Sequence, residues 1–303
     1  MQLQSPAFIY CRGAVRPAEE AVLHVRSEAV VRGVNVFEGL KGYWQADGRF
    51  GLVAPAQHFA RLQRSARLLH LPFTMDYPAY EAACRALLEA LLEPKRDMWL
   101  RTTLYLVEGH WGEGDVTDLV ITGYHQPRGL PEPIALGVSS WRRTDDAAMP
   151  CRIKTSNNYF AARMAKIEGR ARGFGEMILL NSAGRVAEGL GACLAIVRDG
   201  TVITPPASEG ALEGITLDLC EMLCGQMGVP FVRRPIERSE LGICDEAALI
   251  GTLMEITPIK AIDAHALAPG QIFPELSRRY LAAASGASPL DAFGLSVFQP
   301  KGA

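Results

Sequence analysis

Three prolines within seven residues, from Pro127 to Pro133, are the feature that most constrains how this chain of 303 residues can fold. Proline fixes φ and lacks a backbone N–H, so such a run fits neither a helix interior nor a central strand. It is typical of a semi-rigid linker. We therefore expect a smaller N-terminal α/β domain at 1–126, a linker at 127–133 and a larger C-terminal domain at 134–303. A chain of this length is long enough for two domains.

Hydrophobic periodicity indicates that the N-terminal half mixes strands with two helices. Over 55–71 apolar residues recur at helical spacing, and Arg61 lies off the apolar stripe with two further arginines, the usual place for solvated side chains. A second helix is expected over 76–94, since an aspartate and a proline open it. A glycine-rich loop is expected at 108–114. The expected strands lie at 21–25, 41–45, 98–107 and 116–124.

The C-terminal half shows the same mixture, so the predicted fold class is α/β (α+β). Gly173 is expected to stop one helix, and Asp199-Gly200 suits the tight turn of a hairpin. The tail at 282–303 is expected to be helical at first and then poorly constrained. The expected helices lie at 157–172 and 214–227, and the expected strands at 134–141, 176–181, 193–198, 201–204, 231–233 and 247–251.

Composition points to a small-molecule substrate. The formal net charge is −2, which gives no electrostatic reason to expect nucleic acid or a membrane surface as a partner. Seven cysteines without a CxxC pair indicate neither a disulfide framework nor a zinc site, and we expect no metal. No secretory signal pattern and no run of roughly 18 apolar residues is present, so a cytoplasmic location is expected.

Lys154 is the first candidate catalytic residue. It follows an apolar residue at an expected strand end and precedes four small or polar residues. A lysine that attacks a carbonyl carbon must lose its proton, and burial among uncharged neighbours promotes that loss. A lone lysine at a strand end is far more often a solvated surface group. A catalytic role for Lys154 is therefore indicated only if the sequence also contains the other residues that such chemistry needs.

Glu188 could be an acid partner for a pyridine nitrogen. A pyridine ring withdraws electrons best when its nitrogen stays protonated. A carboxylate about 4 Å away stabilises that proton by about 4 kcal/mol at an effective dielectric of 20. Ala187 and Gly189 flank Glu188 and permit close approach of a ring. Taken alone, an exposed glutamate in a turn is the commoner interpretation.

A phosphate cradle completes the set that pyridoxal phosphate requires. Gly214-Ile215-Thr216 offers backbone N–H groups at a helix N-terminus together with a hydroxyl. Gly251-Thr252 repeats the pattern after an expected strand, and Arg61 is a candidate cation. Each pattern is weak alone, because glycine and threonine are common in turns. Their joint occurrence with Lys154 and Glu188 indicates a pyridoxal-phosphate enzyme.

Over about Val31 to Ile262 the chain resembles the class IV (fold type IV) pyridoxal-phosphate-dependent aminotransferases, most of all the branched-chain amino acid aminotransferases. The order and spacing of several motifs together carry this resemblance. These motifs are Phe37-Glu38-Gly39, His58-Phe59-Ala60-Arg61-Leu62, Lys154 to Tyr159, Glu188-Gly189, Leu212 to Thr216, Gly251-Thr252 and Glu255-Ile256-Thr257-Pro258.

The resemblance implies a role for each cofactor residue. Lys154 would form the Schiff base, Glu188 would face the pyridine nitrogen, and Tyr159 would bond the phenolic oxygen. Leu212 would pack on the ring. The phosphate would be held by Arg61, Gly214, Ile215, Thr216 and Thr252.

The substrate set implied by the resemblance departs from the family pattern. Arg101 matches the arginine that handles a substrate carboxylate, and Phe37 and Gly39 match pocket positions. Arg32 and Trp99 stand where branched-chain enzymes usually have tyrosines. The remaining departures are Lys41 for arginine, Leu253 for alanine, Cys193 for asparagine and Leu217 for arginine. We therefore expect an intact cofactor site and an altered substrate pocket.

The resemblance also implies a homodimer or higher homo-oligomer, a cofactor at the domain junction, and transamination between an amino acid and a 2-oxo acid. Within the fold, a lyase of the aminodeoxychorismate lyase type and a D-amino acid transaminase stay open as alternatives. A non-catalytic paralogue that binds the cofactor is a remote one. The sequence leaves the donor, its hand and the pathway open.

Overall fold

The computed structural model describes residues 6–288 and 290–300, which form two compact units. The first unit comprises the chain up to Arg128, the segment Ile153–Asn157 and the chain from Ala283 onward. The second comprises Gly129–Arg152 and Asn158–Ala282. Among the described residues, no helix has the length and apolar character needed to cross a membrane.

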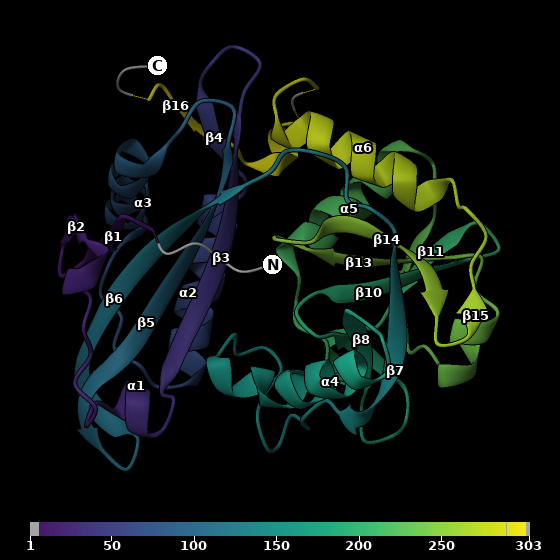
Figure 1. The fold of residues 1–303 in the computed structure, drawn as a ribbon, viewed down its shortest axis with the longest axis horizontal. Coiled ribbons are helices and arrows are strands. Elements are labelled where there is room, and N and C mark those ends of the chain that lie inside the picture. The colour runs from purple at the N-terminus through teal and green to yellow at the C-terminus, as the bar shows by residue number, and fades with distance from the viewer. Residues whose placement is uncertain (1–5, 289, 301–303) are drawn as a thin grey trace. The chain divides into compact units, whose positions relative to one another are not determined.

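The first unit is built on a seven-stranded antiparallel sheet in the order β16-β4-β3-β5-β6-β1-β2 (Figure 1). Its strands are β1 (Phe8–Cys11), β2 (Ala14–Pro17), β3 (Asn35–Trp44), β4 (Phe50–Leu52), β5 (Asp97–His110), β6 (Glu113–Gln126) and β16 (Ser296–Phe298). Its helices are α1 (Glu28–Val31), α2 (Pro55–Leu68) and α3 (Tyr77–Leu91), with 3₁₀ turns at Ala18–Glu20 and Asp291–Phe293.

Helices α2 and α3 form where periodicity predicted them and cover one face of this sheet. Asp76 caps α3 by accepting a hydrogen bond from the backbone N–H of Ala79 at 2.9 Å. Alternate residues of β5, such as Leu100 and Leu104, pack in the same core as Leu62 of α2. The intervening residues of β5 therefore point to the opposite face of the sheet.

The expectation of a strand at 21–25 is wrong. This segment is irregular, and Val22 and Val25 are 69% and 73% exposed. The β-branched side chains that suggested a strand lie on the surface instead of in a ladder. Strand propensity depends on a neighbouring strand to pair with, which the local sequence does not reveal.

The expected glycine-rich loop at 108–114 is also wrong, because β5 and β6 continue through most of it and meet at Trp111-Gly112. Both turn residues have positive φ, 56° and 83°, as a type I′ hairpin turn requires. Gly112 donates its N–H to Glu28 Oε2 at 2.8 Å, which anchors the turn to α1.

The tail at 282–303 was expected to be poorly constrained after a helix; residues 289 and 301–303 lie outside the described residues, and within the described part the strand at 296–298 pairs with the first unit's sheet. Its strand β16 joins β4 in antiparallel register, with Val297 opposite Gly51. Phe298 is 7% exposed and packs edge-on against Phe50, with ring centroids 6.0 Å apart. This aromatic contact is the physical reason that the described tail is fixed.

The second unit contains a nine-stranded mixed sheet in the order β12-β11-β10-β13-β14-β7-β8-β9, with β15 beside β14 (Figure 1). Its strands are β7 (Ile134–Arg142), β8 (Glu176–Leu180), β9 (Val186–Gly189), β10 (Cys193–Arg198), β11 (Thr201–Thr204), β12 (Phe231–Arg233), β13 (Glu246–Gly251), β14 (Glu255–Ile262) and β15 (His265–Ala266). Its helices include α4 (Phe160–Ala171) and α5 (Ile215–Gln226), with 3₁₀ turns at Ala207–Glu209 and Arg238–Gly242. A 3₁₀ turn at Ser156–Tyr159 precedes α4, and α6 (Ile272–Ala284) ends in residues counted with the first unit.

Most predicted elements of the second unit are confirmed. Asp199 and Gly200 take positive φ, 50° and 72°, in the hairpin of β10 and β11. Gly173 takes φ 84° just after α4, as a helix-terminating glycine does. The predicted helix at 157–172 begins as the 3₁₀ turn and becomes α-helical at Phe160.

Candidate active site

The segment that carries Lys154 lies along the edge of β3 that faces away from β5. Strand β4 pairs with Gly42–Trp44 at one end of this edge. Toward the other end, Phe37 donates its backbone N–H to Lys154 O at 2.8 Å. The N–H of Lys154 in turn donates to Ser65 Oγ of α2 at 3.1 Å. The backbone of Lys154 is therefore fixed between β3 and α2.

The Phe37 ring brings together the two side chains predicted to act in catalysis and in substrate binding. Lys154 Nζ lies 4.9 Å from the ring centroid, and the Arg101 guanidinium carbon lies 4.1 Å from it. The antiparallel register pairs Gly39 with Arg101, so Arg101 and Phe37 point to the same face of the sheet. That face is the one opposite the helices.

Trp99 and Gly39 form a second contact on this face. A Cβ added to Gly39 would lie 2.8 Å from Trp99 Nε1, closer than side chains tolerate, so the indole covers the glycine. Tyr124 packs beside the indole with ring centroids 5.6 Å apart. Lys41, directly opposite Trp99 in the register, is 5% exposed, and its Nζ lies 5.3 Å from the Tyr43 ring centroid.

Arg61 is buried, so the expectation that it lies on a solvated helix face is wrong. Its side chain donates from Nε to Glu38 Oε1 at 2.7 Å and from Nη2 to Oε2 at 2.9 Å. His58 Nδ1 also lies 2.8 Å from Glu38 Oε2. Periodicity missed this pairing because the partner is on β3, and a glutamate inside an otherwise buried strand was the available signal.

Burial opposes ionisation of Glu38. The charge of Arg61 and the hydrogen bonds from Arg61 and His58 outweigh that effect and hold the pKa of Glu38 well below its ordinary value. Burial also lowers the pKa of His58, although the hydrogen bond with Glu38 works in the opposite direction. The three side chains form a buried charged cluster directly beneath the strand that carries Phe37 and Gly39.

Arg32, a predicted pocket residue, is bound to Glu28 of α1. Its Nη1 donates to Oε1 at 2.9 Å and to Oε2 at 3.0 Å. The guanidinium carbon also lies 5.1 Å from the centroid of the Trp111 ring. The charge of Arg32 is therefore compensated locally by Glu28.

In the second unit, Glu188 of β9 lies opposite Leu179 of β8 and is 8% exposed. Leu212, also a predicted cofactor residue, donates its backbone N–H to Glu188 Oε2 at 3.0 Å. Arg143 Nε lies 3.0 Å from Glu188 Oε1. Sequence reasoning missed Arg143, because nothing local distinguishes it from Arg142 beside it.

The two glycine-hydroxyl turns meet at the N-terminus of α5. Gly214 occupies the N-cap position, and a Cβ there would lie 2.7 Å from Cys193 Sγ. Cys193 pairs with Ile250 across β10 and β13, immediately before Gly251-Thr252. The first backbone N–H groups of a helix lack intrahelical partners. This corner of the second unit is therefore suited to an anion.

The other predicted residues of the second unit surround these elements. Tyr159 packs with Leu190 in a small core cluster, and its Cε1 would lie 3.8 Å from a Cβ added to Gly191. Thr216 is buried in the first turn of α5. Leu253 follows Thr252 in the turn after β13 and is 38% exposed.

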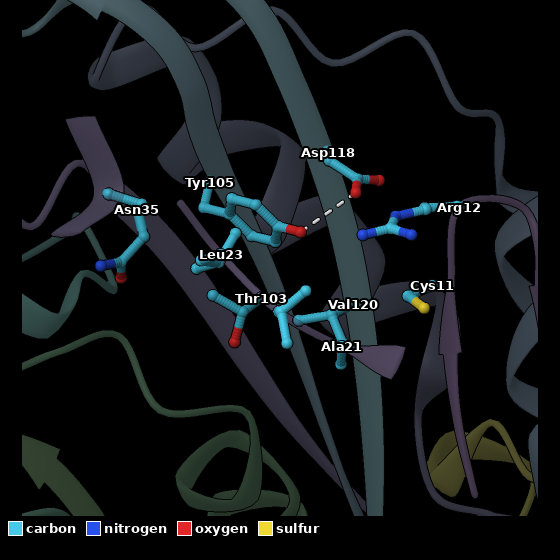
Figure 2. Close-up of a pocket in the computed structure, with 11 residues that line it drawn as sticks. Cys11, Arg12, Ala21, Leu23, Asn35, Thr103, Tyr105, Asp118 and Val120 are labelled. Carbon is cyan, nitrogen blue, oxygen red and sulfur yellow. Dashed lines mark hydrogen bonds between the residues drawn. The ribbon is translucent and has the colours of Figure 1, made fainter. Parts of the chain in front are cut away.

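A hollow of about 230 Å³ lies on the first unit's sheet and is lined by residues other than the predicted catalytic ones (Figure 2). Tyr105 donates its hydroxyl to Asp118 Oδ2 at 3.0 Å within it. Ala21, Val22 and Leu23 of the irregular segment supply apolar lining. Lys154, Phe37 and Arg101 are thus not among the residues that line this hollow.

Comparison with known proteins gives consistent matches. The model of a family described as amino-transferase class IV matches residues 35–262. A probable branched-chain-amino-acid aminotransferase of Aquifex aeolicus is 33% identical over 274 residues, covering 88% of each chain. The branched-chain aminotransferase of the archaeon Thermoproteus uzoniensis, solved with norvaline, superposes with a TM-score of 0.89 at 31% identity, covering 97% of this chain and 99% of that one. The PLP form of the Thermobaculum terrenum enzyme gives 0.89 at 30% identity, covering 97% and 98%.

Proposed function

The chain belongs to the class IV aminotransferase family, and from that premise we propose that it moves an amino group between an amino acid and a 2-oxo acid at a site centred on Lys154. The observation that carries this proposal is the shared Phe37 ring, which holds Lys154 and Arg101 within 4.9 Å and 4.1 Å of one centroid. An amine for chemistry and a guanidinium for a carboxylate are what such a reaction needs.

The cofactor is pyridoxal phosphate, and the residues present fit it. Lys154 supplies the primary amine, Glu188 a nearly buried carboxylate, and the N-terminus of α5 a turn at Gly214, where a side chain would clash with Cys193 Sγ. The similar structure from Thermobaculum terrenum is named as the PLP form of its enzyme. The residues present and the family membership therefore indicate the same cofactor, pyridoxal phosphate.

We assign each cofactor contact to a residue as part of the proposal. Lys154 would attach the cofactor covalently, Glu188 would face its ring nitrogen and Tyr159 its phenolic oxygen, while Leu212 would pack on the ring. Arg61 would hold the phosphate, with Glu38 fixing the guanidinium. The remaining phosphate contacts come from Gly214, Ile215, Thr216 and Thr252. Each polar group of the cofactor thereby meets an opposite charge or a hydrogen-bond donor.

When bound, pyridoxal phosphate provides an electron sink for the pair released from the substrate Cα–H bond. Arg101 binds the substrate carboxylate and so orients Cα toward Lys154, since both side chains lie against Phe37. Lys154 Nζ then accepts the proton from Cα and returns a proton in the opposite half-reaction. Glu188 keeps a negative charge beside the ring nitrogen, which favours the protonated ring.

The proposed substrate pocket differs from that of branched-chain enzymes. Trp99 fills the space over Gly39, and Lys41 lies opposite Trp99 in the sheet register on the face that carries Arg101. A bulky wall and an added cation favour substrates with an aromatic ring or a second acidic group. We therefore propose that valine, leucine and isoleucine are poor donors, although the similar proteins are named as branched-chain enzymes.

We also propose that the protein is a cytoplasmic homodimer. The first unit exposes several large apolar side chains around the hollow and the β5–β6 turn, and exposed apolar patches mark protein interfaces. They are Val22, Leu23, Val25, Val30, Val31, Trp111 and Val116. Val22→Asp with Val25→Asp should yield a monomer in analytical ultracentrifugation, whereas Val232→Asp, on the second unit, should not change the mass.

The domain boundaries at 1–126 and 134–303, with the linker at 127–133, remain part of this proposal. Limited proteolysis tests them: cleavage concentrated within 127–133 is expected, because exposed proline-rich linkers present few backbone contacts. Primary cleavage outside this stretch in the folded protein would contradict the linker.

Product analysis tests the proposed reaction. The purified protein, loaded with pyridoxal phosphate, is incubated with a panel of amino donors, with and without 2-oxoglutarate. A transaminase should form the matching oxo acid and glutamate in equal amounts, and only with an acceptor during steady turnover. A lyase of the aminodeoxychorismate type would instead release pyruvate without any acceptor.

A further inference from the structure

Arg143 and Glu188 form a nearly buried ion pair in the second unit. Arg143 Nε lies 3.0 Å from Glu188 Oε1, and the backbone N–H of Leu212 donates to the other carboxylate oxygen at 3.0 Å. The exposed fractions of the two side chains are 6% and 11%. One carboxylate oxygen therefore accepts a backbone hydrogen bond, and the other lies in ion-pair contact with the guanidinium.

The guanidinium of Arg143 is itself fixed by two backbone carbonyls. Its Nε–H donates to Gly210 O at 3.0 Å, and its Nη1 donates to Asn158 O at 2.7 Å. Gly210 has φ 93°, and a Cβ there would lie 3.1 Å from Arg143 Cγ, so the approach of this backbone depends on glycine. These contacts restrict the Arg143 side chain to one conformation, in which it lies beside Glu188.

The backbone of Arg143 is tied to the same strand pair that carries Glu188. Its N–H donates to Leu180 O at 2.8 Å, just after Leu179, which lies opposite Glu188 in the β8–β9 ladder. Arg143 and Glu188 are thus held by one sheet, although 45 residues separate them in sequence (188 − 143). Such a rigid second contact is the usual means of aiming a functional carboxylate.

We infer that Arg143 is a positioning residue that holds the Glu188 carboxylate in place and orientation for the ring nitrogen of the cofactor. This inference rests on the proposed function, because it takes Glu188 to face that nitrogen. Arg143 acts through Glu188 and needs no contact with substrate. Its removal should matter only while residue 188 carries a carboxylate.

The test is a double-mutant cycle with Arg143→Met and Glu188→Gln in the holoenzyme. Deleting one partner of a buried charged pair should lower kcat/KM by at least about 30-fold in Arg143→Met. In the Glu188→Gln background the same change should alter kcat/KM by less than about threefold. Equal effects in both backgrounds would overturn the inference.

A spectroscopic readout separates positioning from a general loss of structure. The ¹⁵N chemical shift of ring-labelled pyridoxal phosphate reports the protonation of the ring nitrogen. It should move toward the Glu188→Gln value in Arg143→Met, and it should return most of the way in Arg143→Lys, which keeps a cation. An unchanged shift in a folded Arg143→Met holoenzyme would also overturn the inference.

Two controls keep the outcomes distinct. Arg142→Met alters the neighbouring arginine, which donates to Ser182 O on the surface, and it should leave both readouts unchanged. If Arg143→Met does not fold, the cycle is run with Arg143→Lys, whose smaller loss should again vanish with Glu188→Gln. If Glu188→Gln alone is without effect, the proposed role of Glu188 fails, whereas additive losses reject only the role of Arg143.

Discussion

The Trp99 indole occupies the space where a side chain of Gly39 would be, with Nε1 only 2.8 Å from an added Cβ. Both residues lie on the sheet face that carries Arg101, because the register pairs Gly39 with Arg101 and Lys41 with Trp99. Trp99 is buried, so its indole cannot move aside into solvent without loss of packing.

Gly39→Ala should therefore destabilise the protein by about 1 to 3 kcal/mol, the usual range for overpacking a well-filled site. The effect should shrink when Trp99 is first replaced by phenylalanine, because the smaller ring leaves room for the methyl group. Urea unfolding of the two single variants and the double variant measures this. A loss that is equal in both backgrounds would show that the indole is not what Gly39 accommodates.

Glu38→Gln should destabilise the protein by about 3 to 5 kcal/mol at pH 7, since it leaves the buried Arg61 without its charged partner. The pKa of Glu38 is lower in the folded state than in the unfolded chain. Ionised Glu38 therefore stabilises the fold at pH values above its unfolded-state pKa, and this stabilisation is lost as the pH falls below that value. The difference in unfolding free energy between wild type and variant should be constant from pH 7 to about 5 and shrink below about pH 4.3. Glu132→Gln, on the surface, is the control, and a difference independent of pH would contradict the assignment.

Glu188→Gln keeps the shape of the side chain and removes the charge proposed to hold the ring proton. Turnover should fall at least about a hundredfold if 3 of the roughly 4 kcal/mol act in the transition state. Cofactor should still bind, because the phosphate contacts are elsewhere. Stopped-flow and steady-state rates of the loaded variant provide the measurement, and a variant within threefold of wild type would remove Glu188 from this role.

Arg101→Ala should weaken the use of a dicarboxylic acceptor such as 2-oxoglutarate by about 2 to 5 kcal/mol in the specificity constant. Arg26→Ala, on an exposed loop, serves as the control. Specificity constants for leucine, glutamate and phenylalanine as donors test the altered pocket in the same assay. Leucine as the best donor by tenfold would show that Trp99, Lys41 and Leu253 leave a branched-chain pocket functional.

Local patterns in the sequence predicted the elements whose causes are local. The helix over 76–94 was recognised by its aspartate cap, and the β10–β11 hairpin by Asp199-Gly200. Chemical reasoning selected Lys154 and Glu188 as candidates, and the family resemblance added Leu212, whose backbone N–H donates to Glu188. The helix and the hairpin were predicted correctly because each signal lies within a few residues of what it determines.

Contacts between residues distant in sequence could not be predicted this way. The burial of Arg61 depends on Glu38, which lies on another element, and the helix pattern alone suggested a solvated side chain. The pairing of Arg143 with Glu188 and the addition of β16 to β4 likewise follow from the folded sheets. Long-range pairing is decided by tertiary packing, which a periodic pattern does not encode.

Lys154 is the amine proposed to bind the cofactor and to move the proton. Its alanine variant should stay folded, since the Lys154 backbone contacts with Phe37 and Ser65 do not require the side chain. It should nevertheless lose turnover and the visible absorbance of lysine-bound cofactor, because alanine has no amine. Lys260→Ala, at an exposed position of β14, is the matched control.

The most direct measurement is a single half-reaction without acceptor, followed by borohydride reduction and peptide mass spectrometry. The wild-type enzyme should release about one equivalent of the matching oxo acid per site from at least one of glutamate, phenylalanine or leucine, and reduction before the donor is added should attach the cofactor to Lys154. Lys154→Ala should do neither. An oxo acid formed by Lys154→Ala, or a reduced adduct on a different lysine of the wild type, would contradict the account.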